Sequence, residues 1–367
     1  MQRVILFNGS ALKKEMRKNK VFVACFCLLV YSQAFGRAIY RPVDPHVPEI
    51  ITSWQGEASY YKLRNSHLDE YPLFTLFDKD FFQKFKLPDA PIRYRNNEQK
   101  IIAPTLLTNL INHLLQEISD GKRTFTHFIV LQSKDYNFKK SNGLIIVKFK
   151  DYPFVVKLFM ETPESFVKPF DKGLEPIFSF FMAGGINRHL LGFTRIKNRE
   201  IIIKKLAESR WKEMVDIPRK WHWIPPNSKW IQLQGNNIGS HKHQKIEFPG
   251  TYCIIADAIE AERMPSLFNG MDKKMALDLC NYLDIWIDPH MTNFMIEKET
   301  KKFIIVDTEH FPSFTGLYQK VTFSSYSSWY LYLAGKCWHN AFMQTKRERR
   351  ASKKPVPAMS LTDYKFT

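Results

Sequence analysis

The sequence has few of the features that build disulfide-rich or zinc-binding proteins. Five cysteines occur among 367 residues, and no two of them form a CxxC pair. A structural zinc site and a disulfide framework are therefore not expected. Cys25 and Cys27 share one apolar segment, whereas Cys253, Cys280 and Cys337 are widely spaced, so a single disulfide with a spare thiol stays open.

The apolar run at residues 21–31 is too short to cross a membrane, since a transmembrane helix needs about 20 apolar residues. Basic residues precede this run and small residues follow it. That order is typical of a secretory signal peptide. We therefore expect a signal peptide over residues 1–36, an exported or secreted protein, and no stable membrane span. Met16 is an alternative start, and a buried strand or helix is the other interpretation of the run.

Acidic residues are outnumbered by basic ones, 36 to 54, and the formal net charge is +18. This balance favours an anionic partner such as a nucleotide, a nucleic acid or an acidic membrane surface. A nucleic acid is the least favoured, because the sequence has no zinc-finger or RNA-recognition signature. Residues 346–367 form a basic tail, which we expect to be solvated. A basic surface that serves only solubility is an equally simple explanation.

Hydrophobic periodicity predicts one helix and three strands in the first half of the chain. Apolar residues recur at spacings of three and four over residues 104–118, which indicates a helix. Strand-like runs follow at 125–132, 144–149 and 154–159, with turn residues between them. They predict an antiparallel meander, whose third strand contains Lys157 among apolar residues.

Other parts of the chain are less regular in pattern. Residues 37–100 contain scattered prolines and aromatic residues and are expected to be irregular. Residues 221–250 are expected to form a loop with a single strand at 230–233. The spacing over 271–286 predicts a helix, with Asp272 as its N-terminal cap.

A polar turn, Asp288-Pro-His-Met-Thr-Asn293, follows the helix predicted over 271–286. A hairpin is expected over residues 294–306, and it ends in Asp307-Thr-Glu309. Two carboxylates and a carboxamide on neighbouring loops can hold Mg²⁺, a hard ion that prefers oxygen ligands. The structural alternative is that Asp288 opens and Asn293 closes an ordinary turn.

The pattern Asp-x-His-x-x-Asn, hairpin, Asp resembles the protein-kinase-like superfamily, nearest in style to its aminoglycoside phosphotransferase and choline kinase branch. The resemblance covers about residues 124–345. It implies an α+β, bilobal protein-kinase-like fold with an antiparallel-sheet N-lobe and a mainly helical C-lobe. The implied boundaries are an N-terminal extension at 37–123, an N-lobe with an insertion and hinge at 124–263, and a C-lobe at 264–345.

The resemblance also implies a role for each residue of the pattern. Asp288 is the catalytic residue that orients the attacking hydroxyl or accepts its proton. Asn293 and Asp307 bind Mg²⁺, and Lys157 neutralises the phosphates of ATP, because phosphoryl transfer depends mainly on positioning and charge neutralisation. Glu175 is the expected cofactor-site partner of Lys157. The alternative for Lys157 is an edge-strand lysine that reaches into water.

The sequence departs from the kinase pattern at three places. Glu175 is followed directly by a proline, so Glu164 competes with it as the partner of Lys157. The expected phosphate segment, residues 133–143, has a single glycine and several lysines. Trp286-Ile287 stands where kinases commonly have His-Arg or His-Gly before the catalytic aspartate.

The resemblance implies an ATP- and Mg²⁺-dependent phosphotransferase that acts on a hydroxyl of a protein or small molecule, and the expected signal peptide extends this hypothesis to a secreted bacterial effector. The departures keep a second hypothesis open, namely a pseudokinase-type nucleotide- or protein-binding module without turnover. A basic nucleic-acid binder of unrelated fold is the third.

Overall fold

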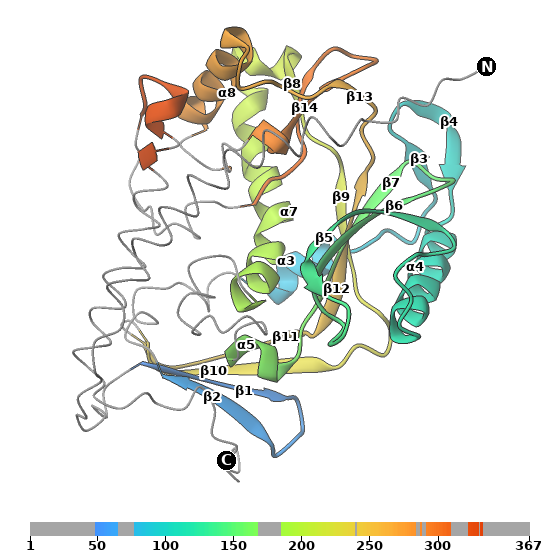
Figure 1. Cartoon of the computed structure of the whole chain (residues 1–367), viewed down its shortest axis with the longest axis vertical. Coiled ribbons are helices and arrows are strands. Elements are labelled where there is room, and N and C mark those ends of the chain that lie inside the picture. Colours follow the sequence, from blue (N-terminus) through green and yellow to red (C-terminus); the bar gives the residue numbers. More distant parts are fainter. Residues whose placement is uncertain are drawn as a thin grey trace.

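The computed structural model describes residues 48–64, 77–167, 185–238, 241–283, 287, 291–309, 322–329 and 331–332 (Figure 1). The expected signal peptide and basic tail lie outside these residues, as do Asp288, His290 and Glu175. None of the described helices is long and apolar enough to cross a bilayer.

A five-stranded antiparallel sheet forms the middle of the structure. Its strands are β-branched and aromatic, and their order across the sheet is β5-β6-β7-β12-β9. The predicted meander is confirmed, since β6 pairs with both β5 and β7. The strands are β5 (Phe128–Asn137), β6 (Asn142–Phe149), β7 (Phe154–Met160), β12 (Thr251–Asp257) and β9 (Lys220–Trp223).

The two faces of this sheet are covered by different helices, α4 (Pro104–Ser119) and α7 (Gly185–Ala207), which lie on opposite sides of it in Figure 1. Successive residues of a strand point to opposite faces. Ile145 and Val147 of β6 therefore join the core under α4, whereas Phe159 and Ile254 join the core under α7. The helix predicted over 104–118 is confirmed as α4.

A second, four-stranded sheet has the order β13-β14-β15-β8. Its strands are β13 (Ala261–Arg263), β14 (Phe294–Glu297), β15 (Phe303–Ile305) and β8 (Val215–Asp216). The predicted hairpin is confirmed as β14–β15. Helix α8 (Gly270–Tyr282) packs on this sheet through a shared apolar core. Asn269 caps α8, whereas Asp272, the predicted cap, binds Arg263 at 2.7 Å.

The expectation of an irregular segment over 37–100 is wrong for its described residues, and the loop expected over 221–250 is mostly strand, although the strand expected at 230–233 is confirmed within β10. A further four-stranded sheet has the order β11-β10-β1-β2 and joins the two regions. In β10 the buried Ile231 and Leu233 alternate with polar residues, the period of a half-buried strand. The strands are β11 (His241–Pro249), β10 (Trp230–Ile238), β1 (Glu49–Trp54) and β2 (Tyr60–Arg64), and β3 (Ile92–Tyr94) pairs separately with β4 (Asn97–Ile102).

The expected bilobal protein-kinase-like fold with a mainly helical C-lobe is also wrong. In the described part of the chain only three helices reach seven residues, and antiparallel sheets dominate. The described part of 264–345 contains α8, then the β14–β15 hairpin, and then helical residues at 326–329 and 331–332. Phe294 and Phe303 lie in apolar runs of a few residues on either side of a turn. Such runs are too short for a long helix, and they bury their side chains by pairing as strands.

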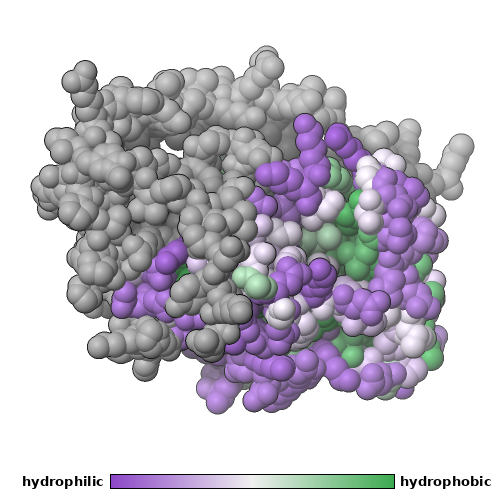
Figure 2. All heavy atoms as spheres, turned by 90° about the horizontal axis from the view of Figure 1, so that it is seen from below, coloured by the Kyte–Doolittle hydropathy of each residue, from purple (hydrophilic) through white to green (hydrophobic). Residues whose placement is uncertain are grey.

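Shorter elements complete the described fold. Helix α3 (Lys79–Lys84) begins at the capping side chain of Asp78, and α5 (Pro163–Val167) follows β7. Two 3-10 turns are η2 (Arg210–Glu213) and η3 (Met291–Asn293). Figure 2 shows that the described part of one face is mainly hydrophilic, with hydrophobic residues in narrow strips between.

Candidate functional site

Lys157 and Asp307 meet although they lie 150 residues apart in the sequence. The Nζ atom of Lys157 is 2.8 Å from Oδ2 of Asp307. Lys157 lies in the middle strand of the five-stranded sheet, paired with Ile146 and Ile254, so the edge-strand alternative is wrong. Asp307 follows β15, where the Val306 amide still donates to the carbonyl of Asn293 and extends the hairpin.

Arg195 of helix α7 binds the same carboxylate. Its Nε donates to Oδ1 of Asp307 at 3.0 Å, and its Nη2 donates to Glu309 at 2.8 Å. The side chain is 4% exposed. Its Nη1 atom is buried and has no hydrogen-bond partner among the described residues. Arg195 therefore joins both carboxylates and keeps unused donor capacity.

The close approach of α7 to the sheet depends on Gly192. A β carbon built there would stand 1.9 Å from the hydroxyl of Tyr252 and 2.9 Å from the ring of Phe159. The Tyr252 hydroxyl also donates to the carbonyl of His189 at 2.5 Å. Because Gly192 lies one turn before Arg195, this contact sets how far the Arg195 side chain reaches toward Asp307.

Lys220, at the start of β9, fixes the backbone around Asp307. Its Nζ donates to the Thr308 hydroxyl at 2.7 Å and to the Val306 carbonyl at 3.1 Å. The Thr308 hydroxyl in turn donates to the Arg195 carbonyl at 2.6 Å, and the Asn198 amide donates to the Thr308 carbonyl. The segment from Val306 to Glu309 is therefore hydrogen-bonded both to α7 and to β9.

Lys157, Arg195 and Lys220 form what we call the cationic triad. Burial lowers the pKa of Lys157 and lowers that of Lys220 well below its ordinary value. Burial by itself would raise the pKa of Asp307, but Arg195, Lys157 and Lys220 hold it far below its usual range. Lys157 and Arg195 thus bind the two carboxylates directly, and Lys220 lies beside them on Val306 and Thr308.

The structure places the predicted residues as follows. Lys157 and Asp307 are in direct contact, and Asn293, the last residue of η3, accepts at its carbonyl from the amide of Val306, the residue before Asp307. The carboxylate that pairs with Lys157 is that of Asp307, while Glu164 belongs to α5. Asp288 and Glu175 lie outside the described residues. No group of three or more His, Cys, Asp or Glu side chains that could hold a metal occurs in the described part of the chain.

The expected phosphate segment, residues 133–143, forms the end of β5, a short turn at 138–141 and the start of β6. The side-chain oxygen of Asn137 accepts from the amides of Lys139 and Lys140 at 3.0 and 3.3 Å. Gly143 has φ of 108°, and a β carbon there would lie 2.2 Å from the carbonyl oxygen of Asp135. The glycine thus serves strand pairing, and Asn137 already satisfies two of the amides of this turn.

Sequence patterns gave no role to Arg195, Lys220 or Thr308. Arg195 stands between Phe193 and Ile196, which are both buried, so a cation within an apolar helix segment was the available signal. Lys220 is the buried first residue of a strand that continues with Trp221. The partners of Arg195 and Lys220 follow β15, about 90 to 110 residues further along the chain. Local sequence patterns do not reveal contacts between residues so far apart.

A separate cavity of about 600 Å³ lies away from the cationic triad. It is lined by parts of α3, the first turns of α4, and the segment between β9 and β10, including Trp223, Pro225 and Trp230. Neither Lys157 nor Asp307 lines it. The cavity and the cationic triad are thus two distinct features of the described fold.

Comparisons of the chain with protein-family models, with curated proteins and with solved structures found no match. The function is therefore inferred from the chemistry of the residues themselves.

Proposed function

We propose that the protein is an ATP- and Mg²⁺-dependent phosphotransferase that acts on a hydroxyl of a protein or small molecule. The observation that carries the proposal is the 2.8 Å contact between Lys157 and Asp307. Phosphoryl transfer requires a cation for the phosphate oxygens and a carboxylate for the metal at adjacent positions. These two side chains supply both.

The charge balance of the site supports a phosphate ligand. Both carboxylate oxygens of Asp307 accept from cations, one from Lys157 and one from Arg195. When ATP binds with Mg²⁺, phosphate oxygens would replace Asp307 as the acceptors for Lys157 and Arg195, and Asp307 would bind the metal. Each buried charge then keeps an opposite charge, which is the condition for holding it away from water. The unpartnered Nη1 of Arg195 gains an acceptor in this exchange.

Asp307 and Asn293 would hold Mg²⁺ by their side-chain oxygens. Mg²⁺ is usually bound through one or two carboxylates together with phosphate oxygens, so a large cluster of acidic residues is not required. Asp288, five residues before Asn293, would orient the attacking hydroxyl. The hydroxyl oxygen bonds to the γ-phosphorus, the bond from that phosphorus to the β-phosphate oxygen breaks, and the hydroxyl proton passes to Asp288.

A binding module without turnover is the second candidate, and one observation favours it. Arg195 bridges Asp307 and Glu309, so fixed cations already neutralise both carboxylates. A nucleotide or another anion could then bind to the cationic triad without a metal. The two candidates differ in their dependence on Mg²⁺.

The location of the protein is part of the proposal. An exported protein needs a compartment that contains nucleotide, which the bacterial periplasm supplies poorly. We place the reaction in a host cell reached by secretion or in the lumen of a secretory organelle.

The test is γ-phosphate transfer from labelled ATP by the full chain, with and without Mg²⁺, together with calorimetric titration of nucleotide. The first candidate predicts Mg²⁺-dependent transfer that Lys157→Met and Asp307→Asn abolish. The second predicts binding without transfer, whether or not Mg²⁺ is present. Absence of both binding and transfer would contradict the two candidates alike.

A further inference from the structure

The two sheets that carry the halves of the site are joined by two short connections. One is the segment from Asp216 to Lys220, between β8 and β9, and the other runs from Asp257 to Ala261, between β12 and β13. Lys157 belongs to the five-stranded sheet, and Asp307 follows a strand of the second sheet. The contact between Lys157 and Asp307 therefore depends on how the two sheets are held against each other.

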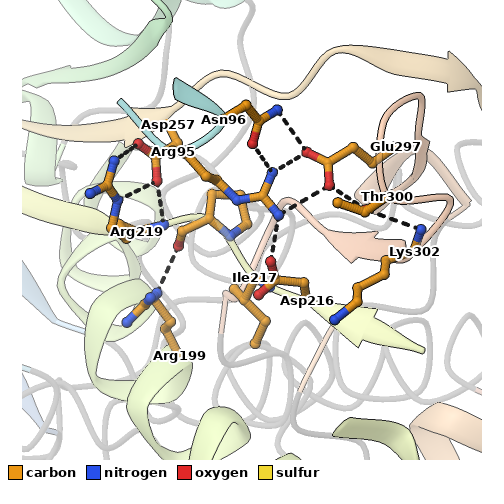
Figure 3. A network of polar contacts seen from close by, with 11 residues as sticks. Arg95, Asn96, Arg199, Asp216, Ile217, Arg219, Asp257, Glu297, Thr300 and Lys302 are labelled. Atoms are coloured by element: carbon orange, nitrogen blue, oxygen red, sulfur yellow. Dashed lines mark hydrogen bonds and ion pairs between the residues drawn. The ribbon is translucent and has the colours of Figure 1, made fainter. Parts of the chain in front are cut away.

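The β3–β4 hairpin bonds to residues of the first connection and to β14, and it reaches the second connection only through Arg219 (Figure 3). Arg95, at its turn, binds the carboxylates of Asp216 and Glu297, which belong to β8 and β14. The neighbouring Asn96 amide donates to Glu297 at 3.4 Å. All these contacts are to the second sheet, so the turn of the hairpin is fixed to that side.

The other side of the hairpin is fixed through Arg219, which precedes β9. Its Nε donates to Oδ2 of Asp257 at 2.9 Å, and its Nη2 donates to Oδ1 at 2.8 Å. The same Nη2 donates to the carbonyl of Arg93 in β3 at 2.7 Å. Arg219 therefore ties the two connections to each other and to the hairpin. Arg199 of α7 adds a bond from its Nε to the Pro218 carbonyl at 2.7 Å.

Burial makes the Arg95 contact stronger than an ordinary surface ion pair. Glu297 is 0% exposed, and the side chain of Arg95 is 14% exposed. Burial would raise the pKa of Glu297, but hydrogen bonds from Arg95 and Thr300 lower it, so the carboxylate is charged. Separating a buried carboxylate from its cation is costly, whereas exposed pairs contribute little.

We propose that the β3–β4 hairpin is a clasp that holds the two sheets together, and that Arg95 is a positioning residue for the contact between Lys157 and Asp307. Arg95 touches neither of these residues and acts on them through β8 and β14. The importance of the Lys157–Asp307 contact for catalysis rests on the proposed function. The claim that the hairpin holds the two sheets together does not depend on that function. It assigns a role to the part of the N-terminal extension from residue 92 to residue 102.

The test measures access to Lys157 without any nucleotide. Arg95→Met alone would leave Glu297 charged and buried and could unfold the chain, so the main variant is Arg95→Met with Glu297→Gln. The matched control is Lys229→Met with Glu57→Gln, which removes an exposed ion pair between the residue before β10 and the turn between β1 and β2. Acetic anhydride labelling followed by mass spectrometry gives the rate at each lysine, and circular dichroism verifies folding.

The clasp predicts that Lys157 labels at least about fivefold faster in the main variant than in wild type, because loosened contacts raise local opening. Lys62, which pairs with Glu49 on the sheet formed by β1 and β10, should label at its wild-type rate. Arg95→Lys keeps one charge without the bidentate geometry and should give an intermediate rate. An unchanged Lys157 rate in the folded main variant would overturn the proposal, and equal acceleration at Lys62 would too.

Failure of this test and failure of the proposed function remain distinguishable. Labelling responds to the separation of Lys157 from Asp307 whether or not the protein transfers phosphate. If the protein proves active, loss of the clasp should raise the KM for ATP in step with the faster labelling. The control pair should leave the KM unchanged.

Discussion

Gly192 of α7 lies against Tyr252 of β12 so closely that no side chain fits between them. A β carbon at Gly192 would stand 1.9 Å from the Tyr252 hydroxyl, which itself donates to the His189 carbonyl. The contact determines the position of Arg195, one turn further along the helix. The close packing of Gly192 against Tyr252 thereby influences the ion pair between Arg195 and Asp307 in the candidate site.

The first prediction concerns Gly192→Ala. The added methyl group must move Tyr252 or α7, and such overpacking costs about 1–3 kcal/mol. Urea unfolding should show that loss, and the Arg195 contacts should weaken with it. Gly270→Ala is the control, because nothing lies within 4 Å of a β carbon built there. Equal stability of the two variants would show that α7 adjusts freely to the sheet.

The second prediction separates the two acidic residues after β15. Asp307 accepts from Lys157 and Arg195, whereas Glu309 accepts from Arg195. If Asp307 binds the metal, Asp307→Asn should reduce phosphate transfer by at least about 100-fold and abolish the Mg²⁺ response. Glu309→Gln should keep the Mg²⁺ response. Titration of transfer rate against Mg²⁺ concentration measures both, and a normal Mg²⁺ response in Asp307→Asn would disprove the metal assignment.

The parts of the fold that were predicted correctly depend on nearby residues. Helix α4 and the meander from β5 to β7 follow from apolar spacing and from turn residues such as Pro153, between β6 and β7. The meeting of Lys157 with Asp307 was expected from the kinase-like order of motifs, and the 2.8 Å contact agrees with it. The metal and phosphate roles given to these residues stay predictions.

The parts that were missed depend on contacts between distant segments. Strand β1 acquires its partner from β10, where Thr52 pairs with Leu233, far along the chain. The site role of Arg195 depends on the fit at Gly192, which has no sequence signature. The helical C-lobe was inferred from resemblance alone, and in the described part of residues 264–345 only α8 is a helix of seven residues or more.

The third prediction concerns acid stability. Burial lowers the pKa of His189 and of His222 from 6.5 to about 3. The unfolded chain therefore binds protons at these residues below about pH 6.5, while the folded chain does not until about pH 3. Stability should fall as the pH drops through this window, because the unfolded state takes up more protons.

His222→Phe isolates one of the two groups. The ring of His222 stacks on Phe82 with centroids 4.2 Å apart, and both its nitrogens are buried without a hydrogen bond among the described residues. Phenylalanine keeps the stacking and cannot take up a proton. Between pH 6.5 and 4.5 the variant should lose about 2–3 kcal/mol less unfolding free energy than wild type. Parallel pH slopes in urea unfolding would contradict the assignment.

The fourth prediction is a double-mutant cycle on Arg95 and Glu297. Arg95→Met leaves a fully buried carboxylate without its arginine and should cost about 3–5 kcal/mol of unfolding free energy. Glu297→Gln should cost less, because Asn96 and Thr300 still lie within hydrogen-bonding distance of the new amide. The double variant should be more stable than Arg95→Met, since it removes the buried charge together with its partner.

Urea unfolding of the four proteins measures the coupling free energy directly. The exposed pair Lys229 and Glu57 provides the matched cycle, for which a coupling of about 0–1 kcal/mol is expected. We expect a coupling between Arg95 and Glu297 well above that value, together with faster labelling of Lys157 in the double variant. The first result would show that removing the buried charge restores stability. The second would show that Lys157 still separates from Asp307 once the clasp is lost. A coupling as small as that of the exposed pair would mean that the hairpin rests on the second sheet without holding it.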